Sequence, residues 1–321
     1  MNKTIRIGIT IGDPAGIGSE VTLKAIKRFK IPFDCTLYVF GDRAVLKKAG
    51  LKGNSHRFNL IDSNIITSSQ FKMGRLSKTL GYASYRYLSN AVKFIKQGTI
   101  NCLVTAAVNK QAISLNRIKF IGHTEFLAKS FGVKKYAMIF IAKGIRASVV
   151  TRHIALSNVS KALNRNSVKQ VIYLTNEALR NDFKIKKPKI AVLGLNPHAS
   201  DGGLIGNEEK VIISPAINDL KTKLKSKCSI FGPLAPDTVF HRVVNQEFDA
   251  VVCMYHDQAL IPFKMLHFFD GINYTAGLPF VRTSCDHGTA FEIAGKNKAD
   301  YHSMLGAINL AYNLTKNRLN H

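Results

Sequence analysis

Short apolar runs alternate with longer amphipathic stretches along the whole chain. Several of the apolar runs lack polar alternation, which is typical of strands buried on both faces of a largely parallel sheet. These runs cover residues 5–11, 35–40, 101–108, 136–142, 145–151, 189–195 and 249–255. The amphipathic stretches predict helices over residues 18–29, 82–97, 157–180, 207–224 and 302–317. The alternation predicts an α/β protein with a doubly wound sheet and a domain boundary near residues 125–135.

Length and composition exclude several classes of protein. The chain has 321 residues, enough for about two domains of ~150 residues. Hydrophobic residues make up 46% and charged residues 21%, which excludes disorder as the main state. No apolar run reaches the ~18–20 residues of a membrane span, and Gly12 to Pro14 interrupt the N-terminal run too early for a signal peptide. Five cysteines without a C-x-x-C pair disfavour a disulfide framework or a zinc ribbon. A cytoplasmic protein is therefore expected.

The charge balance is the outlying property of the composition. The chain has 46 Lys and Arg against 20 Asp and Glu, a net charge of +26, and residues 63–124 hold nine basic side chains and no acid. Such a charge is typical of nucleic-acid binders. The basic residues are, however, spread along the chain rather than packed into a block of about 5–8 residues, and no basic face interleaved with aromatic residues is found. We therefore expect no nucleic-acid partner and interpret the charge as a general bias of the surface.

Three histidines share one sequence context. His153, His198 and His256 each follow the end of an apolar run. In open α/β sheets, ligands bind in the crevice beyond the carboxyl ends of the strands. Three imidazoles converging there would hold one divalent metal and leave positions open for substrate, with Asp257 as a further ligand or orienting partner. The alternative is three unrelated histidines that cap strands or bond to backbone, and the residues alone leave both open.

Other polar or glycine-rich segments also follow predicted strands or begin predicted helices. Residues 12–20 (GDPAGIGSE) match neither G-x-G-x-x-G nor a P-loop. They form either an anion-binding turn at a helix start or an ordinary tight turn with a cap. Residues 122–125 open a helix with His123 at its start, and residues 196–203 (NPHASDGG) are more polar than a structural turn requires. Lys264, Asn273 and Arg282 follow at intervals of nine residues, and the two cations suit a phosphate or carboxylate.

Six motifs together resemble one family over essentially the whole chain. They are GDPAGIG from Gly12, GHTE from Gly122, NPHA from Asn196, GPLAPD from Gly232, YHDQ from Tyr255 and GLP from Gly277. In this order they resemble the 4-hydroxythreonine-4-phosphate dehydrogenases of vitamin B6 biosynthesis. The resemblance implies a homodimer with a shared active site. It also implies that 4-phosphooxy-L-threonine is oxidised with NAD and then decarboxylated to 3-amino-2-oxopropyl phosphate.

The same resemblance assigns site residues. It places three metal ligands on His153, His198 and His256, the last reaching in from the neighbouring subunit, and makes these three and Asp257 the catalytic residues. The implied substrate-binding residues are His123, Thr124, Lys264, Asn273 and Arg282. Neutral imidazoles suit Zn²⁺ or Co²⁺ better than Mg²⁺, although added carboxylates would shift that preference.

A second resemblance concerns the cofactor. The run DHGTAFEIAGK from Asp286 resembles the adenosine-binding loop of isocitrate and isopropylmalate dehydrogenases, which bind NAD without a Rossmann fingerprint. It implies two α/β/α domains with a cleft between them. Residues 1–130 plus 285–321 would carry the NAD loop, and residues 131–284 the metal and the dimer interface. The implied cofactor residues are His287, Gly288, Thr289 and Glu292. A carboxylate near the adenosine hydroxyls would favour NAD over NADP.

Two other functions stay open at this point. A sister enzyme acting on a phosphorylated sugar acid, such as 4-phospho-erythronate, would keep the same metal and NAD sites but lack a partner for the amino group. A non-catalytic relative is disfavoured because every expected site residue is present.

Overall fold

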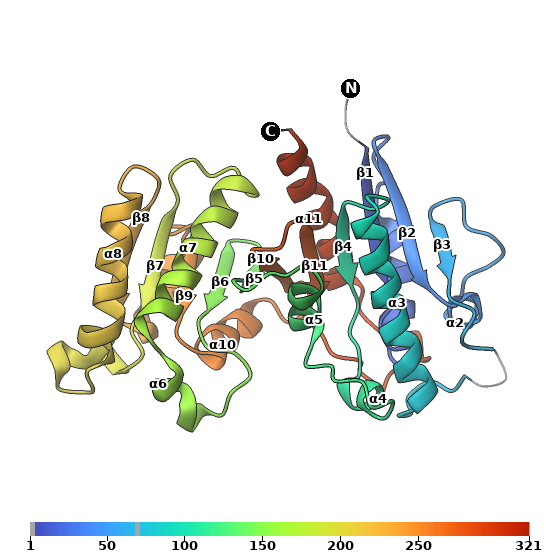
Figure 1. The fold of residues 1–321 in the computed structure, drawn as a ribbon, viewed down its shortest axis with the longest axis horizontal. Helices are drawn as coiled ribbons and strands as arrows, with labels where there is room; N and C mark the ends of the chain where they lie inside the picture. Colours follow the sequence, from blue (N-terminus) through green and yellow to red (C-terminus); the bar gives the residue numbers. More distant parts are fainter. Residues whose placement is uncertain (1–3, 68–70, 321) are drawn as a thin grey trace. The chain divides into compact units, whose positions relative to one another are not determined.

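The computed structural model describes residues 4–67 and 71–320. Two compact units comprise Met1–Lys134 with Leu278–His321, and Lys135–Gly277. The chain therefore leaves the first unit once and returns to it (Figure 1). The boundaries lie a few residues from the expected ones at 130 and 285. Strand β11 (Val281–Cys285), which was expected in the second domain, belongs to the first unit because it pairs with β4 (Cys102–Thr105).

A parallel sheet forms the centre of the first unit, in the order β3-β2-β1-β4-β11. All neighbouring strands in this order pair in parallel. The remaining strands are β1 (Ile5–Thr10), β2 (Cys35–Gly41) and β3 (Asn59–Asp62). Buried, almost continuously apolar strands such as β4 are typical of a parallel sheet covered on both faces. Since parallel strands end at one edge, segments that follow β1, β4 and β11 are brought to the same side of the unit.

Helices of the first unit pack against this sheet. Helix α3 packs on β1, β2 and β4, and α11 packs on β1, β4 and β11 (Figure 1). The Ser77 hydroxyl begins α3 by accepting a hydrogen bond from the backbone N–H of Leu80 (3.4 Å). The helices are α1 (Gly18–Arg28), α2 (Arg43–Lys48), α3 (Lys78–Lys96), α4 (Lys110–Ser114), α5 (His123–Ser130) and α11 (His302–Leu319). The helices predicted over 18–29, 82–97 and 302–317 are thus confirmed.

The second unit has a mixed sheet in the order β10-β5-β6-β9-β7-β8. Its strands are β5 (Ala137–Ala142), β6 (Ile145–Val149), β7 (Lys189–Leu193), β8 (Ser229–Leu234), β9 (Ala250–Cys253) and β10 (Ile272–Ala276). From β6 to β8 the pairs are parallel, whereas β10–β5 and β5–β6 are antiparallel. The sheet was predicted to be largely parallel, and β5 and β6 depart from this because only Lys143 and Gly144 join them, and a two-residue connection can form only a hairpin. Gly144 has the positive φ (81°) that such a turn needs.

The helices of the second unit also differ from the predicted ones. The segment 157–180 divides into a 3₁₀ turn Leu156–Asn158, α6 (Val159–Ala162) and α7 (Arg165–Asn181), because Asn164 and Ser167 form a capping box that begins a new helix. The segment 207–224 becomes a π-helical turn Glu209–Ile213 followed by α8 (Ser214–Leu224). Helix α7 packs across β5, β6, β7, β9 and β10 (Figure 1).

Two further helices complete the core of the second unit. They are α9 (Pro236–Val244) and α10 (His256–Leu266). Val243 of α9, Phe263 of α10 and Val251 of β9 are buried in one apolar cluster. This cluster anchors α10, whose first residue is one of the three predicted metal ligands. No helix in the described part of the chain is long and apolar enough to cross a membrane.

Candidate functional site

Two of the three predicted metal ligands lie together in the second unit. His153 follows β6 and His256 begins α10 just after β9, and β6 and β9 are parallel neighbours. The ring centroids of the two histidines are 6.0 Å apart. Both rings line a pocket of about 160 Å³, together with Thr151, Tyr255, Asp257 and apolar side chains. The shared strand-end context therefore does place these two imidazoles at one cavity.

The third predicted ligand, His198, is not brought to this pair by a single chain. His198 follows β7 within the 3₁₀ segment Pro197–Gly203, and its side chain is exposed. Within residues 4–67 and 71–320, no three His, Cys, Asp or Glu side chains come together to hold a metal ion. His256 lies beside His153 of its own chain, and the contribution of His256 to the site of a neighbouring subunit stays a prediction.

The surroundings of the histidines nevertheless fit a divalent metal. The Nδ1 atom of His256 lies 2.6 Å from Asp257 Oδ1, and the Nδ1 atom of His198 lies 3.3 Å from Asp201 Oδ2. A carboxylate at Nδ1 orients the ring and leaves Nε2 as the donor to a metal, as is usual for metal-binding histidines. His153 (φ 49°) and His198 (φ 52°) both adopt left-handed backbone conformations, which are costly and concentrate at functional sites.

A buried amide ties two of the histidine-bearing strand ends together. The Oε1 atom of Gln258 accepts a hydrogen bond from the backbone N–H of Met254 (2.7 Å), at the end of β9. Its Nε2 donates to the backbone oxygen of Gly194 (2.9 Å), at the end of β7. Sequence reasoning treated Gln258 only as part of the YHDQ motif. The signal available in the sequence was an amide side chain two residues after the candidate ligand His256.

Two predicted substrate-binding residues also belong to the second unit. Lys264 lies on α10, with its Nζ atom 5.6 Å from the centre of the Phe268 ring. Asn273 lies on β10, and its side-chain oxygen is buried without a hydrogen-bond partner among the described residues. A buried acceptor of this kind is costly unless a ligand or water supplies a donor. Asn273 therefore has the character of a binding residue.

Arg282 and Thr124 form a buried group in the first unit. Arg282 lies on β11 and is only 3% exposed. Its guanidinium donates to the hydroxyl of Thr105 at the end of β4 (2.7 Å) and approaches the hydroxyl of Thr124 on α5 (3.5 Å). Burial lowers the pKa of Arg282 to about 10. The guanidinium is therefore still charged at neutral pH, and a buried, planar cation of this kind suits an anionic ligand.

His123 at the start of α5 is held neutral. Burial, and then the nearby cations Arg282 and Lys110, lower the pKa of His123 to about 3. Its ring packs edge-on against Phe120, with centroids 5.9 Å apart. The Nε2 atom is buried without a hydrogen-bond partner among the described residues. At neutral pH this ring can donate or accept a hydrogen bond with a ligand but carries no charge.

The glycine-rich turn after β1 contacts the predicted cofactor loop, residues 286–297. The backbone N–H of Ile17 donates to the backbone oxygen of Thr289 (3.0 Å). A Cβ atom at Gly16 would lie 2.7 Å from the same oxygen, so only glycine allows this approach. Two segments that sequence reasoning treated separately thus form one local structure. In it, the turn supports the loop.

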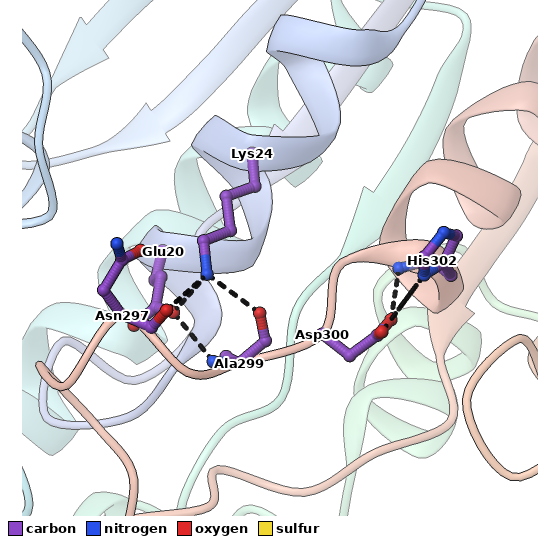
Figure 2. Close-up of polar contacts among 6 residues, drawn as sticks. All are labelled: Glu20, Lys24, Asn297, Ala299, Asp300 and His302. Carbon is purple, nitrogen blue, oxygen red and sulfur yellow. Dashed lines mark hydrogen bonds and ion pairs between the residues drawn. The ribbon is translucent and has the colours of Figure 1, made fainter.

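Helix α1 also fixes the chain just after this loop, as Figure 2 shows. The Lys24 ammonium donates to Glu20 (2.8 Å) and to the backbone oxygens of Asn297 and Ala299 (3.0 Å each). Glu20 in turn accepts from the backbone N–H of Ala299 (2.9 Å). The ion pair is largely buried. It therefore anchors the end of the loop through both a donor and an acceptor.

Two of the four predicted cofactor residues, Gly288 and Glu292, are exposed, whereas His287 and Thr289 are half-buried. His287 Nδ1 lies 2.9 Å from the backbone oxygen of Gly288, and a Cβ atom at Gly288 would meet nothing within 4 Å. Open space at Gly288 leaves room for a ligand near the backbone, and NAD binding there stays a prediction.

Comparison with known proteins decides the family. The family model described as "Pyridoxal phosphate biosynthetic protein PdxA" matches residues 33–311. The chain belongs to this family. It is 41% identical to the 4-hydroxythreonine-4-phosphate dehydrogenase of Desulfosudis oleivorans, over 97% of this chain and 96% of the relative. It is also 38% identical to the D-threonate 4-phosphate dehydrogenase of Salmonella typhimurium, over 97% and 99% of the two chains.

A solved structure agrees with this assignment to the PdxA family. The 4-hydroxythreonine-4-phosphate dehydrogenase of Klebsiella pneumoniae is similar with a TM-score of 0.84 at 34% identity, covering 98% of this chain and 99% of that one. The family identified from the six motifs and the α/β dehydrogenase fold are thereby confirmed.

Proposed function

We propose that the chain is an NAD- and metal-dependent dehydrogenase of 4-hydroxythreonine 4-phosphate that serves pyridoxal phosphate biosynthesis. It would oxidise the 3-hydroxyl group, and loss of CO₂ would then give 3-amino-2-oxopropyl phosphate. The observation that carries the proposal is the pair His153 and His256 at adjacent strand ends, with Asp257 on the ring of His256, in a chain of the PdxA family. The relatives named above support the substrate.

The three histidines would hold the metal, with Zn²⁺ or Co²⁺ preferred over Mg²⁺ because the donors are neutral imidazoles. When bound, such an ion lowers the pKa of an alcohol and stabilises negative charge on oxygen. Asp257 orients His256 and Asp201 orients His198, so each ring presents Nε2. The resemblance predicts that a second copy supplies His256, whereas the proximity of His153 and His256 within one chain favours His198 as the ligand supplied by a second copy; mixtures of variants distinguish the two arrangements.

The remaining predicted residues would bind the substrate's anionic groups and the cofactor. Lys264 and Arg282 would hold the phosphate and the carboxylate, with the bidentate guanidinium fixed by Thr105 and Thr124. Neutral His123 and the unpaired oxygen of Asn273 would supply uncharged hydrogen bonds. The loop 286–297 would bind NAD through the residues His287, Gly288, Thr289 and Glu292.

An exposed apolar surface supports a homodimer. Helix α10 and the turn after it expose large apolar side chains, and Met265 is 81% exposed. The surface comprises Ile261, Met265, Leu266, Phe268 and Phe269. Large apolar side chains exposed together on one short segment are typical of a protein contact. Because α10 begins with His256, a second copy that covers this surface would lie near the predicted metal ligands.

D-threonate 4-phosphate is the competing substrate, since relatives as similar as 38% carry that name. It carries a hydroxyl where 4-hydroxythreonine 4-phosphate carries an amino group. Purified protein assayed with NAD, Zn²⁺ or Co²⁺ and each compound decides between them. We expect a higher kcat/KM for the amino compound. A higher value for the threonate would reassign the substrate, and no NADH from either would overturn the proposed activity.

A further inference from the structure

The segment that carries His198 has an unusual backbone. Residues 198–202 all adopt positive φ values, of 52°, 54°, 73°, 45° and 70°. A left-handed conformation costs about 1–2 kcal/mol for each residue with a side chain, and only the last of these five is glycine. Such a segment persists only when contacts with the surrounding structure stabilise it.

The buried carboxylate of Glu209 forms hydrogen bonds with the two residues that lie just before this turn. Its Oε1 atom accepts hydrogen bonds from the backbone N–H groups of Leu195 (2.7 Å) and Asn196 (2.8 Å). Its Oε2 atom accepts from the side-chain amide of Asn196 (2.9 Å). Glu209 is only 3% exposed. Both oxygens are therefore committed to the two residues that precede Pro197 and His198.

The neighbouring carboxylate of Glu208 makes a second contact with Asn196. Glu208 Oε2 also accepts from the side-chain amide of Asn196 (2.9 Å). Hydrogen bonds from Ser160 and then from Asn196 lower the pKa of Glu208, so this group is ionised near neutral pH. The amide of Asn196 thus donates to two adjacent carboxylates. Unlike Glu209, however, Glu208 makes no hydrogen bond to the backbone of residues 195 and 196.

We propose that Glu209 is a positioning residue that sets the place of His198 for metal binding. It does so by fixing the backbone of residues 195–196, from which the left-handed turn and the His198 ring project. The inference rests on the proposed metal centre. A carboxylate suits this task because it offers two acceptor oxygens, whereas a glutamine offers one. Glutamine could keep both backbone hydrogen bonds at its single oxygen but would turn a donor toward the Asn196 amide.

This geometry predicts a graded series of variants. Glu209→Ala removes the acceptor of the half-buried backbone N–H groups of Leu195 and Asn196, so we expect the affinity for Co²⁺ to fall by about 10–100-fold. Glu209→Gln disturbs the side-chain bond between Glu209 and Asn196, and Asn196→Ala removes the side-chain bonds of Asn196 to both Glu208 and Glu209. Both variants keep the acceptor for the backbone N–H groups, so we expect smaller losses from both. Glu177→Gln is the matched control, because Glu177 is in the same unit and, among the described residues, its carboxylate accepts from the side chains of Asn176 and Asn181 and from no backbone group. We expect it to leave Co²⁺ affinity unchanged.

The experiment measures two quantities on the full-length protein. Co²⁺ affinity is obtained from an absorption titration, and amide hydrogen exchange is followed over residues 195–205. We expect Glu209→Ala to speed exchange there by about 10-fold or more, and Glu209→Gln to preserve slow exchange at residues 195 and 196. If Glu209→Ala does not fold, Glu209→Gln and Asn196→Ala still test the proposal, because each is expected to bind Co²⁺ less tightly than the wild type.

The outcomes separate this inference from the proposed function. Wild-type protein that binds no Co²⁺, or binds it equally well after His198→Ala, would overturn the proposed metal centre and the inference with it. Normal wild-type binding with unchanged affinity in Glu209→Gln, Asn196→Ala and Glu209→Ala would overturn the inference alone. Faster exchange without a loss of affinity would do the same, because the loop would then not govern the ligand.

Discussion

The candidate anion-binding residues of the first unit and the candidate metal ligands of the second differ in how far one chain completes them. Arg282, Thr124 and the Nε2 atom of His123 are buried, and the guanidinium is already fixed by hydroxyls. In contrast, the side chains of His198 and His256 are 63% and 43% exposed. The anion-binding residues of the first unit are preformed, whereas the metal ligands of the second unit are exposed rings that one chain does not bring together as a set of three. Preformed groups lower the cost of ordering on binding, and exposed, oriented rings suit a centre that a second copy and a metal complete.

The largest expected effect comes from removing a metal ligand. His256→Ala should lower kcat by ~100-fold or more, since even partners of metal ligands cost 10–100-fold. Mixing inactive variants then tests which chain supplies which ring. A mixture of His198→Ala and His153→Ala dimers that exchange subunits should regain activity, because one of its two sites has all three histidines intact if His198 comes from the second copy.

The control for that experiment is a mixture of His256→Ala and His153→Ala. It should stay inactive, because these two residues lie 6.0 Å apart in one chain and each site would lack one of them. The reverse pattern, with recovery only in the second mixture, would show that His256 is the ligand exchanged between subunits. The contrast between the two units would then remain, but the shared residue would be a different one.

The preformed state of the first unit is tested by Arg282→Lys. Lysine keeps the charge but cannot donate to Thr105 and a ligand from one planar fork. We expect the KM for the phosphorylated substrate to rise by about 10–100-fold, with Co²⁺ affinity unchanged. Steady-state kinetics and the metal titration measure the two effects. A loss of metal affinity in this variant would mean that the two sets are not independent.

A smaller effect is expected from Gly288→Leu. No atom lies within 4 Å of a Cβ at this position, so the substitution should not disturb the fold. If the adenosine of NAD approaches the backbone there, its KM should rise by about 10-fold, while the KM for substrate stays constant. Unaltered NAD kinetics in a folded variant would place the cofactor elsewhere.

The last prediction concerns the pH dependence of stability and not catalysis. His123 has a pKa of about 3 in the folded chain and ~6.5 when unfolded. Between these values the unfolded state binds more protons, so the free energy of unfolding should fall as pH decreases from ~6.5 toward 3. Asp13, whose pKa burial raises to about 6, has the opposite slope. The difference between wild type and His123→Gln in denaturant titrations at pH 4–7 isolates the histidine. An identical pH profile would show that His123 is not held neutral.

Patterns in the sequence predicted the elements and loops well where local chemistry decides them. Apolar runs located most strands, and three strand-end histidines were identified before the structure placed two of them side by side. The split of the segment 157–180 was missed because Asn164 is a capping residue only when the chain before it turns away. The roles of Gln258 and Glu209 were missed because their partners are backbone groups 64 and 13–14 residues away. The periodicity of apolar residues does not predict hydrogen bonds between a side chain and a distant backbone group.

The return of the chain to the first unit has a consequence for synthesis on the ribosome. Strand β4 pairs on one side with β1, but its other neighbour, β11, emerges only after the whole of Lys135–Gly277. Until then one edge of β4 is an open template for wrong pairing. Arg282 and Thr105, which are 177 residues apart, also meet only at that late stage. The candidate anion-binding group around Arg282 would thus be among the last features of a nascent chain to form, and a truncated product would lack it.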